Sequence, residues 1–263
     1  ILVESLACCV PSSARQCLFS SSVHSVIAYT HICACHIRPF CWHTEGVKIA
    51  TRDASALTDA DLDEFAAMGG AFGIGAVSKA KDSWVLATTA YDGKTLVGFM
   101  FLTLERLGGT PCVVMGLLSV KPAAKRDLAM KGLMTEAYHR ALMAFPDEDV
   151  VIGARFVTAA GLEAFAAVTS MIPRPKYNAV GEERAWGRRL ARRYAIEPQY
   201  DPATFIAKAN AQSGFIDYEP VKKPKIAAEV AAFFKGVNVA KGGVLIVHGW
   251  TMAESLAKLG KKR

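Results

Sequence analysis

Residues 111–145, PCVVMGLLSVKPAAKRDLAMKGLMTEAYHRALMAF, decide the fold. The run from Val113 to Val120 is continuously apolar, which is typical of a strand covered on both faces. Pro122 ends it, because proline has no N–H to give to a strand ladder. Beyond the turn, apolar residues recur near a 3.6-residue period, which predicts an amphipathic helix over 128–144.

The turn between this strand and this helix is basic, with Lys125, Arg126 and Asp127 in sequence. The helix directs its free N–H groups and its positive dipole end at the turn, which makes a candidate anion site. The alternative is an ordinary strand-turn-helix unit with a basic residue in its turn. The order of the surrounding elements favours the anion site.

The elements around this stretch follow from apolar patterns and turn residues. Thr58 and Asp61 form a capping pair at the start of a helix. Asp92-Gly93 and Gly108-Gly109 are turns between closely spaced strands, which predicts an antiparallel meander. The predicted strands are 47–51, 84–91, 96–105, 112–120 and 149–157, and a further helix is predicted over 160–168.

From residue 47 to 168 this gives the order β-α-β-β-β-α-β-α, which resembles the GNAT (Gcn5-related N-acetyltransferase) superfamily. Leu118-Ser119-Val120-Lys121-Pro122 is similar to the family's L-x-V-x-P strand end, and the basic turn leads into Leu133-Met134-Thr135-Glu136-Ala137. The resemblance implies an α/β fold with a mixed, mostly antiparallel sheet flanked by helices, to which this chain adds a C-terminal α/β extension.

The resemblance also implies acetyl-CoA, or another acyl-CoA, as cosubstrate. In the family the strand end offers backbone groups to the pantetheine arm, which here assigns Leu118, Ser119 and Val120. The following turn wraps the pyrophosphate, and the matching residues are Lys125, Arg126, Asp127, Leu128, Ala129, Met130, Lys131 and Gly132.

The chain departs from the family pattern Q/R-x-x-G-x-G/A in this turn. Arg126 keeps the basic start, but Ala129 and Lys131 stand where the glycines belong. A Cβ hinders close approach of a phosphate to the backbone, and the Asp127 carboxylate repels one. Phe165 stands where the family often has a tyrosine acid, and it has no proton to give.

Two residues are candidates for acid–base chemistry. Glu105, late in a strand, is placed to act as a base on the attacking amine, and Tyr194 is a candidate acid. A packing role for Tyr194 stays open. The arginines in the helix over 182–194 either clamp an anion or form a solvated face.

Residues 1–46 differ from the rest, since they hold six of the seven cysteines and four of the six histidines. A zinc site at Cys33, His36, Cys41 and His43 is one interpretation, but its spacing matches no common zinc motif. The favoured interpretation is an unstructured or non-native leader over 1–46, followed by a GNAT-like domain over 47–215 and a C-terminal extension over 216–263 that packs on it.

The positive charge is concentrated in the C-terminal part, where residues 221–263 contain nine basic and two acidic side chains. No basic face with interleaved aromatic residues marks a nucleic-acid groove, so nucleic acid is not expected as a partner. No apolar run is long enough to cross a membrane. Outside 1–46 only Cys112 remains, which favours a reducing compartment and a cytoplasmic location.

The function that the resemblance implies is acyl-CoA-dependent N-acyl transfer, by direct attack of a small-molecule or peptide amine in a ternary complex. The alternative is a degenerate GNAT-fold protein that binds acyl-CoA or another ligand, or serves as an interaction scaffold, without catalysis. A third interpretation is a nucleic-acid or anionic-surface binder that uses the basic tail. A homodimer is an open option, and the sequence does not name the acceptor.

Overall fold

The computed structural model of the chain describes residues 40–44, 46–168, 170–208 and 214–261. Its strands are joined in a single sheet. They are β1 (Phe40–Thr44), β2 (Val47–Asp53), β3 (Leu86–Asp92), β4 (Thr95–Leu107), β5 (Thr110–Val120), β6 (Val150–Phe156), β7 (Ser170–Ile172), β8 (Tyr200–Asp201), β9 (Ile206–Ala207), β10 (Ile216–Asp217) and β11 (Val244–Thr251).

Six α-helices and four 3₁₀ helices accompany these strands in the described part of the chain. The α-helices are α1 (Asp59–Ala67), α2 (Ile74–Ser83), α3 (Arg126–Ala144), α4 (Gly181–Arg193), α5 (Ala228–Phe233) and α6 (Ala253–Leu259). The 3₁₀ helices are η1 (Ala54–Ala56), η2 (Ala160–Phe165), η3 (Glu197–Gln199) and η4 (Val239–Lys241). No helix in the described residues is both long and apolar enough to span a membrane.

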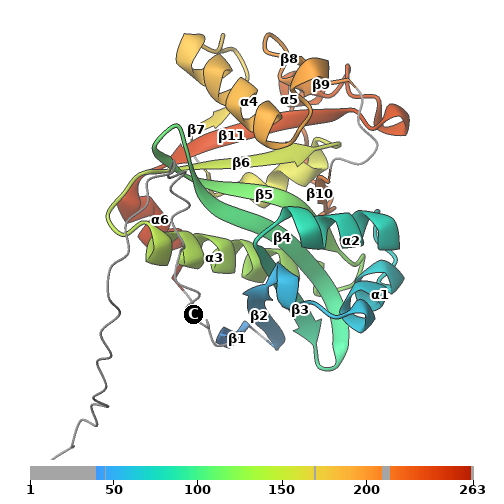
Figure 1. Cartoon of the computed structure of the whole chain (residues 1–263). Coiled ribbons are helices and arrows are strands. Elements are labelled where there is room, and N and C mark those ends of the chain that lie inside the picture. Colours follow the sequence, from blue (N-terminus) through green and yellow to red (C-terminus); the bar gives the residue numbers. More distant parts are fainter. Residues whose placement is uncertain (1–39, 45, 169, 209–213, 262–263) are drawn as a thin grey trace, which may run out of the picture. The chain divides into compact units, whose positions relative to one another are not determined.

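The sheet runs in the order β1-β2-β3-β4-β5-β10-β6-β11-β9-β8, and β7 pairs with β11 (Figure 1). The pairs from β1 to β5 are antiparallel, as is the pair of β6 with β11. β5 and β6 are parallel to each other, and β10 is parallel to both. The mixed, mostly antiparallel sheet predicted from the sequence is confirmed.

Helix α3 packs on one face of the sheet because its apolar stripe turns inward. Leu133, Ala137 and Ala141 are fully buried among core residues of that face. The side chains of β5 alternate between the two faces, so Val113 joins the α3 core while Cys112 joins the core under α4. The sheet is therefore covered on both sides, which agrees with the continuously apolar sequence of β5.

Helix α1 begins where the sequence predicted it. Thr58 accepts a hydrogen bond from the Asp61 backbone, and the Asp61 carboxylate accepts one from the Thr58 N–H, which completes a capping box. Phe65 then stacks on Phe99 of β4 with ring centroids 4.6 Å apart. Helix α2, with Val77 and Ala80 buried, lies in the same core.

The structure differs from the sequence prediction at several elements. Helix α2 lies where no helix or strand was predicted, and the helix predicted over 160–168 is the shorter 3₁₀ helix η2. β1 occupies 40–44, within the segment expected to be unstructured, and pairs with β2. The remainder of 1–46, except Gly46, lies outside the described residues.

The predicted boundary at 215/216 falls inside one compact unit, Ile37–Arg263. β11, which follows that boundary, pairs with β6 along its whole length. The apolar residues at the start of β11, Val244 to Val247, therefore lie within the sheet. β11 is in fact an interior strand, because it has β6 on one side and β7 and β9 on the other.

His248 on β11 gives a pH-dependent stability. Its side chain is 1% exposed, its Nε2 lies 3.0 Å from the Glu183 carbonyl oxygen, and burial lowers its pKa to about 4 from 6.5. Between these pH values the unfolded chain binds more protons, so the free energy of unfolding falls as the pH drops from 6.5 to 4, in total by about 3 kcal/mol.

Urea unfolding at pH 7.5, 6 and 5, on the natural chain and on His248→Gln, measures this effect. Glutamine keeps a donor for the Glu183 carbonyl but does not titrate. The expected result is a shallower loss of stability in the variant as the pH falls. If the free energy of unfolding falls equally with pH in the two proteins, His248 is not the cause of the pH dependence.

Candidate functional site

The two parallel strands at the centre of the sheet separate at their C-terminal ends. β5 and β6 pair directly only at Cys112–Val114 and Val151–Gly153. Beyond these residues β10 lies between them, with Ile216 opposite Leu118 on β5 and opposite Phe156 on β6. The separation of β5 from β6, here called the gap, is therefore present, and a strand of the same chain fills it (Figure 1).

Hydrogen bonds hold β10 in the gap. The backbone N–H of Leu118 donates to the Phe215 carbonyl at 3.1 Å. The Asp217 carboxylate accepts from the Ser119 hydroxyl at 2.7 Å and from the Ala71 backbone N–H at 2.8 Å. Of the residues assigned to the pantetheine arm, Leu118 and Ser119 are thus bonded to the segment 215–217.

Val120, the third of these residues, is buried and lies opposite Gly98 of β4. Its place in the sheet is therefore set by the antiparallel meander. Of the three, only Leu118 and Ser119 border β10.

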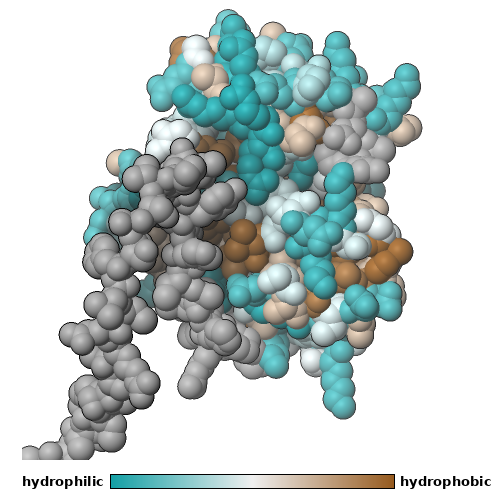
Figure 2. Space-filling model, in the orientation of Figure 1, coloured by the Kyte–Doolittle hydropathy of each residue, from teal (hydrophilic) through white to brown (hydrophobic). Residues whose placement is uncertain are grey.

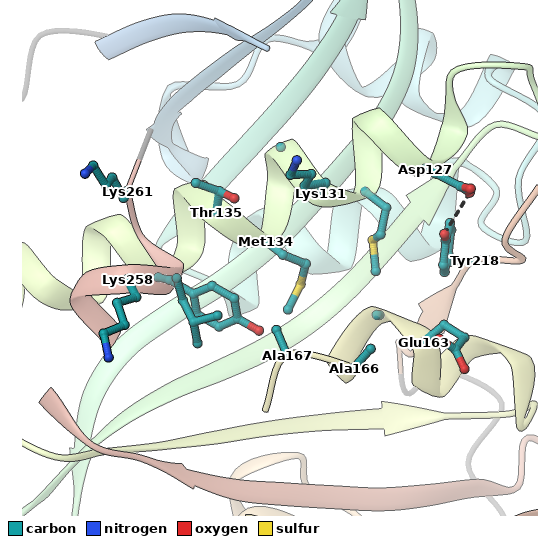
Figure 3. A pocket seen from close by; sticks show the side chains of 15 residues that line it. Asp127, Lys131, Met134, Thr135, Glu163, Ala166, Ala167, Tyr218, Lys258 and Lys261 are labelled. Atoms are coloured by element: carbon teal, nitrogen blue, oxygen red, sulfur yellow. Dashed lines mark hydrogen bonds between the residues drawn. The ribbon is translucent and has the colours of Figure 1, made fainter. Parts of the chain in front are cut away.

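The basic turn is also engaged by the chain itself. Arg126 Nη2 donates to the Pro220 carbonyl at 2.8 Å. Asp127 Oδ1 accepts from the Tyr218 hydroxyl and from the Val221 backbone N–H, both at 2.9 Å (Figure 3). Asp127, which would repel a pyrophosphate, therefore has a structural partner in the segment that follows β10.

Burial and the hydrogen bond to the Asp127 carboxylate both raise the pKa of Tyr218, so its hydroxyl stays protonated and remains a donor to that carboxylate. Lys125 Nζ pairs with Asp92 Oδ1 at 2.8 Å. The charged side chains at the N-terminal end of α3 are thus bound by protein groups.

The remaining residues assigned to the turn divide into two groups. Ala129 is fully buried and Leu128 is half-buried against the α3 core. Met130, Lys131 and Gly132 line a cavity of about 570 Å³ between α3, η2 and α6, here called the α3 cavity. The structure therefore places part of the predicted cofactor set at a cavity and part in the core.

The α3 cavity is polar on several sides. Lys131 extends from α3, and Lys258 and Lys261 come from α6 and the residues just after it (Figure 3). Tyr138 also lines the cavity, and its buried hydroxyl has no hydrogen-bond partner among the described residues. Burial raises the pKa of Tyr138, so the hydroxyl is a donor. Two acids, Asp127 and Glu163, also line the cavity, so three lysines and two carboxylates border it. The lysines and the Tyr138 hydroxyl suit a ligand that carries phosphate or other acceptor oxygens.

The predicted acid–base pair lies away from this cavity. Glu105 is on β4 opposite Cys112, at the end of β5 far from the gap, and its Oε1 accepts from Arg193 Nε at 2.5 Å. Tyr194 is 6% exposed and its hydroxyl has no partner in the described chain. Burial raises the pKa of Tyr194, while the Arg155 guanidinium 4.0 Å from its ring centroid acts in the opposite sense.

Two arginines of α4 make contacts within the protein, one as an ion pair and one over an aromatic ring. Arg192 pairs with Glu197, and Arg189 lies over the Trp186 ring. Figure 2 shows a mostly hydrophilic surface over α4. These contacts agree with the solvated-face interpretation of the 182–194 helix. The side chains considered for zinc lie outside the described side chains.

Four residues of the cavities and the gap are not marked by any motif in the sequence. Tyr138, Asp217 and Tyr218 have no local signal, because their partners are distant in the sequence. Arg155 had one, since a single cation lies within the apolar strand VVIGARF. A charged side chain in such a strand is expected to be buried and to need a partner.

The order of strands and helices, together with the gap between β5 and β6, gives this chain a GNAT-like fold, as its sequence predicted. No family model and no curated protein matches the sequence. Similar solved structures are acetyltransferases. One is an aminoglycoside 6′-acetyltransferase type Ii, 15% identical, with 48% of this chain and 86% of that chain covered and a TM-score of 0.36.

Two further structures are similar over a comparable part of the chain. An acetyltransferase from Bacillus subtilis in complex with CoA is 18% identical, covers 47% of this chain and 78% of its own, and has a TM-score of 0.34. A GNAT family acetyltransferase from Brucella melitensis in complex with acetyl-CoA is 18% identical and has a TM-score of 0.28; the match covers 40% of this chain and 74% of that chain.

Proposed function

We propose that this chain is a GNAT-fold protein that binds the nucleotide end of an acyl-CoA, or a ligand with the same phosphate chemistry, in the α3 cavity. It does not transfer an acyl group while β10 fills the gap. The single observation that carries the proposal is β10, because Leu118 and Ser119, two of the three residues assigned to the pantetheine arm, are already paired with this strand.

The lysines of the α3 cavity support the binding part of the proposal. Lys131, Lys258 and Lys261 surround it from two sides, and their ammonium groups attract phosphate oxygens. The Tyr138 hydroxyl is a buried donor without a partner in the described chain, and a bound acceptor removes the resulting penalty. The α3 cavity also lies within the size range of small-molecule sites.

The second candidate is the acyl-CoA-dependent N-acyltransferase, acting on a small-molecule or peptide amine with acetyl-CoA as cosubstrate. It is favoured by the shortness of β10, which is two residues long and can leave the gap when the acyl arm enters. Glu105 is the proposed base and Tyr194 the proposed acid of this candidate. The position of Glu105 at the end of β5 far from the gap, and its ion pair with Arg193, count against this assignment. The cytoplasmic location and the homodimer also remain proposals.

Isothermal titration of three ligands into the full chain separates the candidates. Adenosine 3′,5′-bisphosphate is the nucleotide end of CoA without its arm. We expect it to bind with a Kd within about threefold of those of CoA and acetyl-CoA, because an arm that stays outside the gap adds little. CoA binding more than about tenfold tighter than adenosine 3′,5′-bisphosphate, together with release of the CoA thiol from acetyl-CoA when amines are added, would favour the transferase instead.

Lys131→Gln combined with Lys258→Gln is the matched variant. Because two exposed phosphate contacts are lost, the Kd of each of the three ligands is expected to rise by about tenfold. Lys94→Gln removes an equally exposed lysine from the turn after β3, and it should leave the Kd of all three ligands unchanged. Absence of heat with every ligand in the natural chain would refute both candidates.

A further inference from the structure

A second cavity, of about 280 Å³, lies on the opposite face of the sheet from α3. Its walls come from α2, Trp84, β6 and the end of α4, and its lining includes Ala76, Arg155 and Tyr194. Successive side chains of β6 point to opposite faces of the sheet. Because Ala154 and Phe156 belong to the core under α3, Arg155 between them points to the other face. We call it the Arg155 cavity.

Arg155 is a buried cation that has no acidic partner in the described part of the chain. Its side chain lines the cavity although the residue is only 2% exposed. Nη2 donates to the Gly116 carbonyl at 2.7 Å, the guanidinium carbon lies 4.0 Å from the Tyr194 ring centroid, and Nε has no partner in the described chain. Among the described residues no carboxylate forms an ion pair with it.

The other charged groups around the cavity add no negative charge. Its described lining contains three basic side chains, Lys79, Arg155 and Arg193, and no acidic one. Glu105 lies behind Arg193 and is paired with it, so that acid is already neutralised. The net charge that the cavity presents to a ligand is therefore positive.

A buried cation is unfavourable unless an anion compensates it. Burial lowers the pKa of Arg155 to about 10, which still leaves the guanidinium protonated at neutral pH. The described residues thus leave a positive charge uncompensated at a cavity of about 280 Å³, which is just below the usual size of ligand pockets and has room for a molecule of a few heavy atoms. This is the expected arrangement of an anion-binding group before its ligand arrives.

We infer that the Arg155 cavity binds the carboxylate of a small organic acid, whose apolar body packs against Trp84 and the alanines of α2. A carboxylate is favoured over a phosphate, because the single buried guanidinium of Arg155 matches one negative charge, and because Trp84, Leu117 and the α2 alanines form an apolar part of the lining for an organic body. Arg193 lies over the Trp84 ring, which keeps that wall in position. This inference does not depend on the α3 cavity or on acyl transfer.

Benzoate and benzamide test the inference, because they share a ring and a shape and differ in charge. In titrations of the full chain, benzoate is expected to bind and benzamide to bind at least tenfold more weakly. Arg155→Met, which keeps an apolar stem under Tyr194 without the charge, is expected to abolish the preference. Inorganic phosphate is the third probe, and it should compete with benzoate only weakly.

Ala76→Phe is a second variant that leaves Arg155 untouched and fills the cavity from α2. It should reduce benzoate binding by at least tenfold even if Arg155→Met does not fold. Equal binding of benzoate and benzamide, or benzoate binding that survives Ala76→Phe, would overturn the proposal. Phosphate binding as tight as that of benzoate would also overturn the carboxylate assignment. Binding of CoA-type ligands is expected to be the same in both variants.

Discussion

Replacement of Arg140 by methionine is expected to lower the free energy of unfolding by about 3–5 kcal/mol. Arg140 Nε donates to Glu136 Oε1 at 2.8 Å one turn away on α3, and Thr51 on β2 donates to the same oxygen at 3.1 Å. The Glu136 side chain is fully buried. Without the guanidinium, the buried Glu136 carboxylate would lose the ion pair that compensates its charge between α3 and β2.

The matched control removes both charges. Glu136→Leu with Arg140→Met replaces the pair by apolar side chains of similar volume, and such replacements are often neutral or stabilising. Urea unfolding of the natural chain, the single variant and the double variant forms the series. A double variant that is as unstable as the single one would mean that packing, and not the buried charge, causes the loss.

Asp217→Ala is expected to lower the free energy of unfolding by about 2–4 kcal/mol and to open the gap. Its carboxylate accepts hydrogen bonds from the Ser119 hydroxyl and the Ala71 N–H, and Ser119 is fully buried, so both donors lose a charged acceptor. With β10 held less tightly, the CoA arm can compete for the gap. Titration should show CoA binding about tenfold tighter in the variant, with adenosine 3′,5′-bisphosphate unchanged.

Glu219→Ala is the control, since Glu219 is an exposed acid two residues further along the same segment. It should affect neither stability nor the ratio of the two affinities. If Asp217→Ala folds and both ligands bind as they do to the natural chain, the gap is not where the arm goes. Only the nucleotide part of the proposal would then survive.

The parts of the fold with strong local patterns could be predicted from the sequence. β5 is continuously apolar, α3 has a helical stripe, and the Asp92-Gly93 turn sets the antiparallel pairing of β3 and β4. Helix α2 was missed because two glycines at its start and its small residues give no clear apolar stripe. η2 was predicted as a longer α-helix because a 3₁₀ helix has no separate sequence signature.

The site could be predicted only in part, because its key contacts are not local. β10 is too short to show any periodicity, and its partners on β5 lie about a hundred residues earlier. Asp127 did stand out as a poor neighbour for a pyrophosphate, but its partner Tyr218 lies far along the chain. Sequence reasoning could therefore mark Asp127 as unusual without explaining it.

The occupant of the gap is covalently attached, which changes how affinities for this protein should be read. A tethered strand has an effective concentration that dilution does not lower, so a ligand arm meets the same competition at every protein concentration. If β10 holds the gap closed by ~2 kcal/mol, only about 3% of molecules are open, and the apparent Kd for an arm-inserting ligand is weakened about 30-fold. Substitutions in β10 can thus set the affinity for such a ligand without touching any residue that contacts it.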